Sequence, residues 1–208
     1  MLMVENLLGF LVSFILLMAG VTVHEFAHGW VAYKRGDNTA KLSGRLTLNP
    51  LAHIDPMMTF IFPLLLFLST GGRFVFGAAK PVPVNFSALK NPRQDMVLVG
   101  LAGPAANLLL AFVLSLLWKI IPHYPLNSFI FSSLITINVV LAVFNLIPIP
   151  PLDGSRILMG LLPSKLAYKY ALIDRYGFVI IIALLWLGAL DLAIFPLVNR
   201  ILNLLARL

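Results

Sequence analysis

Residues His24-Glu25-Phe26-Ala27-His28 form an H-E-x-x-H motif. On an α-helix, residues four positions apart share a face, so the two imidazoles can bind one metal ion between them. Zinc is the usual ion, and the glutamate is then placed to exchange protons with a water molecule at the open coordination position. The motif predicts zinc hydrolase chemistry, with His24 and His28 as ligands and Glu25 as general base and acid.

The motif lies in the last third of an apolar run that extends from Leu7 to Val31. A run of this length can cross the hydrocarbon core of a bilayer. An ionised carboxylate near the centre of such a helix costs about 2.5 to 3.5 kcal/mol on insertion scales. Ionisable clusters at membrane depth are therefore functional by default, which makes an accidental motif the weaker interpretation.

Composition indicates a polytopic membrane protein. Of 208 residues, 60% are hydrophobic and 11% are charged, and the mean hydropathy is +0.97. These values exclude an ordinary soluble domain. The sequence has no cysteine, which excludes disulfides, cysteine zinc sites and iron–sulfur clusters and leaves histidine and carboxylate as strong metal ligands. The net charge is +7, and the Lys and Arg residues lie between the apolar runs, as membrane topology predicts. This charge therefore does not indicate nucleic-acid binding.

Four apolar runs are long enough to cross a bilayer, at residues 4–33, 96–121, 126–147 and 177–195. A fifth run at residues 57–69 is shorter and contains Pro63, which favours a re-entrant or interfacial segment. The expected fold is an all-α polytopic membrane protein with about four full transmembrane helices, this short segment and a small extended hairpin.

The chain shows no repeat, low-complexity tract or interdomain linker. We expect a single integral membrane domain over residues 1–208. Its catalytic core covers about residues 4–162, and a C-terminal helical segment covers about residues 163–208.

Charge distribution predicts the orientation in the membrane. If residues 57–69 do not cross, twelve of the fifteen Lys and Arg residues share one side, which the positive-inside rule makes cytoplasmic. His28 lies six residues before Lys34, about 9 Å along a helix, so the metal site is expected near this surface. The expected location is a prokaryotic cell membrane. The twelve residues are Lys34, Arg35, Lys41, Arg45, Arg73, Lys80, Lys90, Arg93, Arg156, Lys165, Lys169 and Arg175.

A third zinc ligand is needed, because catalytic zinc usually takes three protein ligands. Asp153 stands in the segment Asn145–Gly154, where three prolines break the helix at membrane depth. Broken backbone is tolerated there when it is buried in protein or lines a polar cavity. The alternative is that Asp153 merely caps a following helix at residues 155–162. The expected topology places Asp153 at the same side of the membrane as the two histidines. This favours Asp153 as the third ligand over Asp55, Asp95, Asp174 and Asp191.

Together these motifs resemble the site-2 protease family of intramembrane zinc metalloproteases. The resemblance rests on His24 to His28, on Asn145 to Gly154 read as N-x-x-P-x-P-P-L-D-G, and on Gly103 to Asn107, which is similar to the family's G-x-x-x-N element. It implies one Zn²⁺ per chain held by His24, His28 and Asp153, with Glu25 as the catalytic residue. No segment resembles a PDZ or CBS domain, so the chain looks like a minimal member.

Other residues have two possible roles each. The resemblance makes Asn145 a candidate catalytic residue that steadies the developing oxyanion, whereas the alternative is a hydrogen bond between helices. For Gly103 and Asn107 we favour a structural role in the core, because small residues at this spacing allow close helix packing.

The extended region at residues 72–85 is a candidate substrate-binding segment. The resemblance places substrate contacts before the middle core helix, and an extended strand could pair with an unwound substrate. An ordinary surface hairpin is the alternative. The candidate contacts are Phe74, Val75, Phe76, Val82 and Val84.

The predicted function is hydrolysis of peptide bonds in or near transmembrane segments of membrane proteins. Its partners are transmembrane protein or peptide substrates and the lipid bilayer, with no nucleic acid. One alternative is a non-hydrolytic intramembrane metal-binding or transport protein, which would not need Glu25. An inactive scaffold would not need the intact motif, and a zinc peptidase facing open water should draw a glutamate ligand from a soluble domain.

Overall fold

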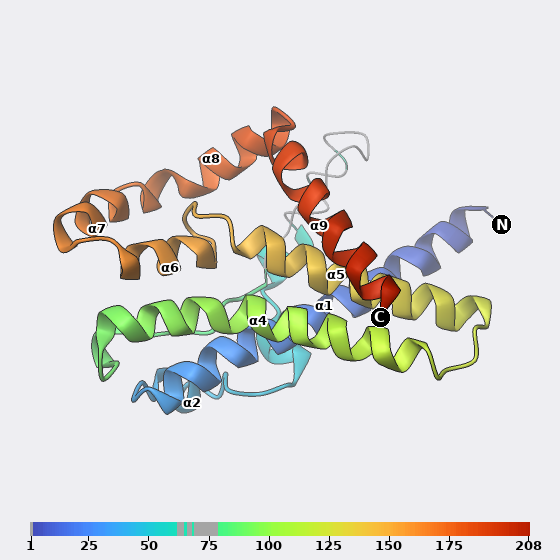
Figure 1. Cartoon of the computed structure of the whole chain (residues 1–208), viewed down its shortest axis with the longest axis horizontal. Coiled ribbons are helices and arrows are strands. Elements are labelled where there is room, and N and C mark those ends of the chain that lie inside the picture. The colour runs from blue at the N-terminus through green and yellow to red at the C-terminus, as the bar shows by residue number, and fades with distance from the viewer. Residues whose placement is uncertain (1, 62–64, 66–67, 69–78) are drawn as a thin grey trace.

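The structure is a computed structural model that describes residues 2–61, 65, 68 and 79–208 (Figure 1). The elements within the described residues are helices and connecting segments, and no strand occurs among them. This confirms the all-α class.

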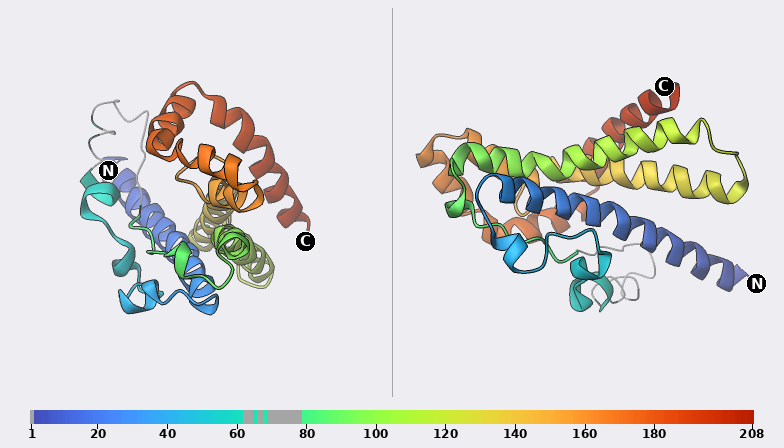
Figure 2. Two further views of the ribbon diagram at one scale, coloured as in Figure 1. Left: turned by 90° about the vertical axis from the view of Figure 1, so that its left-hand side faces the viewer. Right: turned by 90° about the horizontal axis from the view of Figure 1, so that it is seen from below.

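Three long helices form the body of the protein. They are α1 (Leu2–Lys34), α4 (Pro92–Trp118) and α5 (Pro125–Asn145), and they run alongside one another in all views (Figures 1 and 2). Within them, Val12–Lys34, Pro92–Trp118 and Pro125–Asn145 are long and apolar enough to cross a membrane. The protein is therefore an integral membrane protein, and three of the expected spans are confirmed among the described residues.

The expected fourth span is divided into two helices. The run at residues 177–195 is shared between α8 (Asp174–Trp186) and α9 (Ala189–Arg207). Gly188 lies between them with a φ of 68°, a left-handed conformation that glycine adopts without a Cβ clash. α9 packs against α5 through Leu190, Ile194 and Val198, which recur every four residues and are buried in a shared core. A count of four continuous spans is therefore not obtained.

α4 occupies the centre of the bundle and contacts α1, α5 and α6 (Asp153–Leu161). Small residues allow this. A Cβ on Gly100 would lie 3.2 Å from the carbonyl oxygen of Asp153, so a glycine here lets α6 approach closely. The short helices α6, α7 (Ser164–Ala171) and α2 (Thr39–Leu42) gather at one end of the long helices (Figure 1, left).

The connection from α1 to α4 carries the turns η1 (Pro50–His53), η2 (Pro56–Ile61) and η3 (Phe86–Ala88). The first part of the short apolar run is η2, whose Phe60 ring lies 5.2 Å from that of Phe14 on α1. Residues 79–85 are irregular, without strand pairing among the described residues. The rest of the expected hairpin, residues 72–78, lies outside the described residues.

Candidate active site

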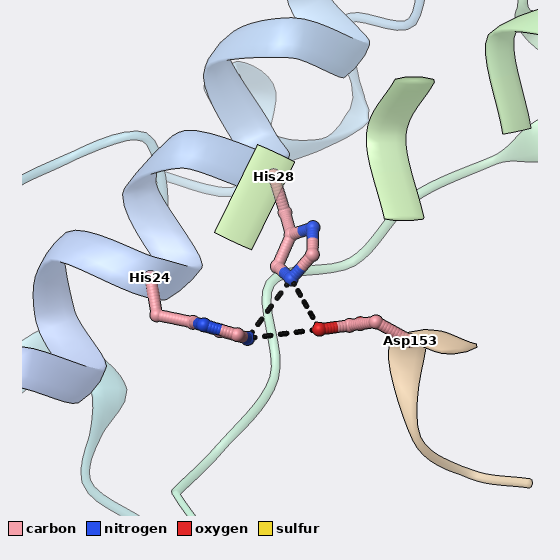
Figure 3. A group of neighbouring side chains, drawn as sticks. All are labelled: His24, His28 and Asp153. Carbon is pink, nitrogen blue, oxygen red and sulfur yellow. Dashed lines mark hydrogen bonds and ion pairs between the residues drawn. The ribbon is translucent and has the colours of Figure 1, made fainter. Parts of the chain in front are cut away.

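Three side chains from distant parts of the chain point toward one another (Figure 3). His24 and His28 come from α1, and Asp153 is the first residue of α6. Asp153 Oδ2 lies 3.0 Å from His24 Nε2 and 3.2 Å from His28 Nε2, and the two Nε2 atoms are 3.1 Å apart. The expected triad therefore forms, with both histidines buried and the aspartate half-buried.

The remaining ring nitrogens explain why the Nε2 atoms face inward. His24 Nδ1 lies 2.5 Å from the Asn107 side-chain oxygen, and His28 Nδ1 lies 2.6 Å from the Val99 carbonyl oxygen. Both partners are acceptors, so each Nδ1 carries the hydrogen and donates it. Each Nε2 then presents a lone pair to the same point as the carboxylate of Asp153. Three acceptors that converge in this way can hold a cation between them.

The distances fit zinc. Tetrahedral zinc with ligands at 2.0 to 2.1 Å separates the ligand atoms by about 3.3 Å, close to the spacing of the three atoms here. The three residues therefore suit one Zn²⁺.

Gly103 of α4 packs directly against the imidazole rings of His24 and His28. A Cβ at this position would lie 2.3 Å from His28 Nε2 and 2.7 Å from His24 Nε2, distances that no real contact allows. Asn107, one turn further along α4, also belongs to the site, because its side-chain oxygen accepts a hydrogen bond from His24. The structural role expected for Gly103 and Asn107 therefore includes shaping and orienting the metal site.

Asn138 of α5 is a residue that the sequence reasoning missed. Its side-chain oxygen accepts a 2.6 Å hydrogen bond from Asn107 Nδ2, and it is fully buried. Asn107 Nδ2 also lies 3.2 Å from the Gly20 carbonyl oxygen. This network fixes the amide that orients His24. The available signal was an amide residue inside a predicted membrane span.

The proline-rich segment that carries Asp153 is held by close backbone packing. A Cβ on Gly154 would lie 2.2 Å from the Leu146 carbonyl oxygen, and one on Gly177 of α8 would lie 2.0 Å from the Pro150 carbonyl oxygen. These glycines let the segment fold tightly between α5 and α8, which sets the position of Asp153.

Glu25 is half-buried, and its Oε2 accepts a 2.7 Å hydrogen bond from the main-chain N–H of Val82. The side chain of Val82 is buried, and Val84 packs in a small core formed by Ala32, Leu89 and Val99. The other expected substrate contacts, Phe74, Val75 and Phe76, lie outside the described residues.

Asn145, the expected oxyanion donor, lies at the last residue of α5. Its Nδ2 donates a 2.9 Å hydrogen bond to the Leu141 carbonyl oxygen one turn earlier. An amide nitrogen has two hydrogens, so this bond leaves a second donor for another acceptor.

Comparison with known proteins gives the family. The model of peptidase family M50 matches residues 12–130 and 124–186, a region that contains all three converging side chains. The chain belongs to peptidase family M50. A protein of Bacillus subtilis named "Putative zinc metalloprotease YwhC" is 41% identical over 194 residues, covering 89% of this chain and 84% of that protein.

Other relatives also carry zinc metalloprotease names. "Putative zinc metalloprotease Rip2" of Mycolicibacterium smegmatis is 35% identical over 192 residues, covering 89% of this chain and 72% of that protein. "Zinc metalloprotease MJ0392" of Methanocaldococcus jannaschii is 29% identical over 168 residues, covering 79% of this chain and 38% of that protein. No solved structure gives a significant match. This M50 protein is an intramembrane zinc metalloprotease, which supports hydrolysis over the non-hydrolytic alternative.

Proposed function

We propose that this protease cleaves transmembrane segments of membrane proteins with His24, His28 and Asp153 as zinc ligands and Glu25 as the proton-transfer residue. The observation that carries this assignment is the convergence of three acceptor atoms within 3.2 Å, with Glu25 next to His24 on the same helix. The whole chain acts as one domain.

The chemistry follows from the residue types. Bound zinc would supply a Lewis acid and lower the pKa of water toward about 7. Glu25 accepts a proton from the attacking water and later passes it to the leaving amine. The second N–H of Asn145 is our proposed donor to the developing oxyanion, where one donor is worth about 2.7 to 4 kcal/mol in other enzymes.

Substrate must reach Glu25 in an unwound form, because an intact helix shields its peptide bonds with its own hydrogen bonds and side chains. The irregular residues 79–85 run past Glu25 and support a substrate role for this region. We propose that Phe74, Val75, Phe76 and Val84 contribute contacts to such an unwound segment. The Val82 side chain is buried against α1, so Val82 contributes through its main chain, by its hydrogen bond to Glu25.

The active site is proposed to lie near the cytoplasmic side. His28 is six residues from the end of α1, and basic residues such as Lys41, Lys165 and Lys169 belong to the helices gathered at that end. The positive-inside rule assigns such an end to the cytoplasm.

The experiment is cleavage of a transmembrane test peptide, weakened by Gly or Pro, in liposomes. Glu25→Gln retains the shape of the side chain but cannot take a proton, so cleavage should fall by about 10² to 10⁴-fold while zinc content is unchanged. Asp55→Asn is the matched control, because this acidic residue caps η2 at its first turn. Wild-type cleavage by zinc-loaded Glu25→Gln would contradict the proposal.

A further inference from the structure

Residues 80–85 are tied at both ends to the region that follows α1. At one end, Arg45 Nη2 donates a 2.7 Å hydrogen bond to the Lys80 carbonyl oxygen, and Lys80 N donates to the His53 carbonyl oxygen at 2.9 Å. At the other end, Asn85 N donates a 2.7 Å hydrogen bond to Asp37 Oδ2. We call residues 80–85 the tethered segment.

Two of the ties are made by buried ionic side chains. Asp37 is 1% exposed and Arg45 is 9% exposed. Burying a charge is costly unless hydrogen bonds compensate, and Asp37 is compensated at both oxygens. Oδ2 accepts from Asn85, while Oδ1 accepts from the main-chain N–H and the hydroxyl of Thr39. A carboxylate this fully engaged holds the segment in one place.

The middle of the tethered segment reaches Glu25. The Val82 N–H donates to Glu25 Oε2 at 2.7 Å. The Val82 side chain faces α1, where its Cγ1 lies 3.0 Å from the position of a Cβ on Gly29. The lack of a side chain at Gly29 therefore lets the Val82 amide come close to the helix that carries the H-E-x-x-H motif.

We infer that Asp37 is a positioning residue that acts on Glu25 through the tethered segment. Asp37 holds Asn85, the segment holds Val82, and the Val82 N–H binds Oε2 of Glu25. This restricts rotation of the carboxylate and leaves Oε1 to take the proton from the reacting water. The inference rests on the proposed role of Glu25. A segment tied at both ends by buried groups keeps one position, which argues against a segment that must move for the site to open.

Asp37→Asn tests the inference, with Thr39→Val as its matched control. Asparagine has one acceptor oxygen, and the two donors of Thr39 compete for it, so an NH₂ group would face the N–H of Asn85. The tie to the segment is then lost. Thr39→Val removes the hydroxyl from Oδ1 and leaves the Asn85 hydrogen bond in place.

The first readout does not depend on activity. Hydrogen exchange of zinc-free protein in detergent should be faster at the Val82 and Asn85 amides in Asp37→Asn and unchanged there in Thr39→Val. The second readout is kinetic. In zinc-loaded Asp37→Asn, kcat should fall about 10- to 100-fold, the range for a lost hydrogen bond to a charged group, with KM and zinc content unchanged. Thr39→Val should stay within about twofold of wild type.

Arg45→Met is the second variant in case Asp37→Asn does not fold. It removes the side-chain tie to the Lys80 carbonyl oxygen, at the opposite end of the segment, and leaves the Lys80 N–H bond to His53 in place. It should have the same direction of effect on exchange and kcat. Unchanged exchange, unchanged or raised kcat, or loss of zinc in the folded variant would each overturn the inference. Absence of cleavage by the wild-type protein would instead contradict the proposed function, so the two failures are distinguishable.

Discussion

Asn107 Oδ1 lies 2.5 Å from His24 Nδ1, so a residue of the middle helix selects the tautomer of a histidine 83 positions earlier in the chain. The hydrogen on Nδ1 leaves Nε2 as an acceptor, which zinc binding requires. α4 thus orients the metal site without supplying a ligand to it.

Removal of any one of the three converging side chains should abolish stoichiometric zinc binding. We expect purified protein to bind about one Zn²⁺ per chain and His24→Ala, His28→Ala and Asp153→Ala to lose it, because a catalytic site needs three protein ligands. Metal analysis after detergent extraction measures this. Full zinc content in Asp153→Ala would remove Asp153 from the site, whereas Asp174→Ala, which lies in a neighbouring helix, should retain the metal.

Asn107→Leu should weaken zinc binding by about 10- to 100-fold, because it removes the acceptor for His24 Nδ1. Asn138→Leu should have a smaller effect in the same direction, since Asn138 acts by holding Asn107. Competition with a chelator of known affinity measures both. Asn127→Leu is the control, because its Nδ2 donates to the Pro122 carbonyl oxygen, outside the site. An affinity unchanged in Asn107→Leu would show that His24 is oriented by other contacts.

Gly103→Ala should prevent zinc binding although it adds a single methyl group. The new Cβ would lie 2.3 Å from His28 Nε2 and would force the imidazoles apart. Zinc content is the measurement, with circular dichroism to show that the helices persist. Leu101→Ala, at an exposed position of the same helix, should bind zinc normally. A zinc-replete Gly103→Ala protein would mean that α1 and α4 can separate at little cost.

Cysteine labelling tests the orientation, because the sequence has no native cysteine. Lys41→Cys and Lys90→Cys should react with an impermeant thiol reagent from the cytoplasmic side, and His123→Cys should react from the opposite side. The reason is that residues 34–93 and 153–176 are expected to face the cytoplasm, with both termini opposite. Labelling of positions 41 and 90 from opposite sides would mean that residues 57–69 cross the membrane.

Sequence alone determined the features that depend on local spacing and composition. An interval of four residues places His24 and His28 on one helix face regardless of the rest of the fold. Long apolar runs predict spans because their burial in lipid does not depend on which helix lies beside them. Asp153 could be proposed because few acidic residues occur at membrane depth, and the motif order resembled a family that the comparisons then confirmed.

Tertiary structure decided what depends on neighbours far away in the sequence. The division of residues 177–195 follows from one left-handed glycine and from packing of α9 on α5. The parts played by Gly103 and Asn138, and the contact of Val82 with Glu25, arise from atoms that lie within a few ångströms but are separated by tens of residues. Helix periodicity carries no information about which faces of separate helices meet, because that is set by side-chain fit across the whole bundle.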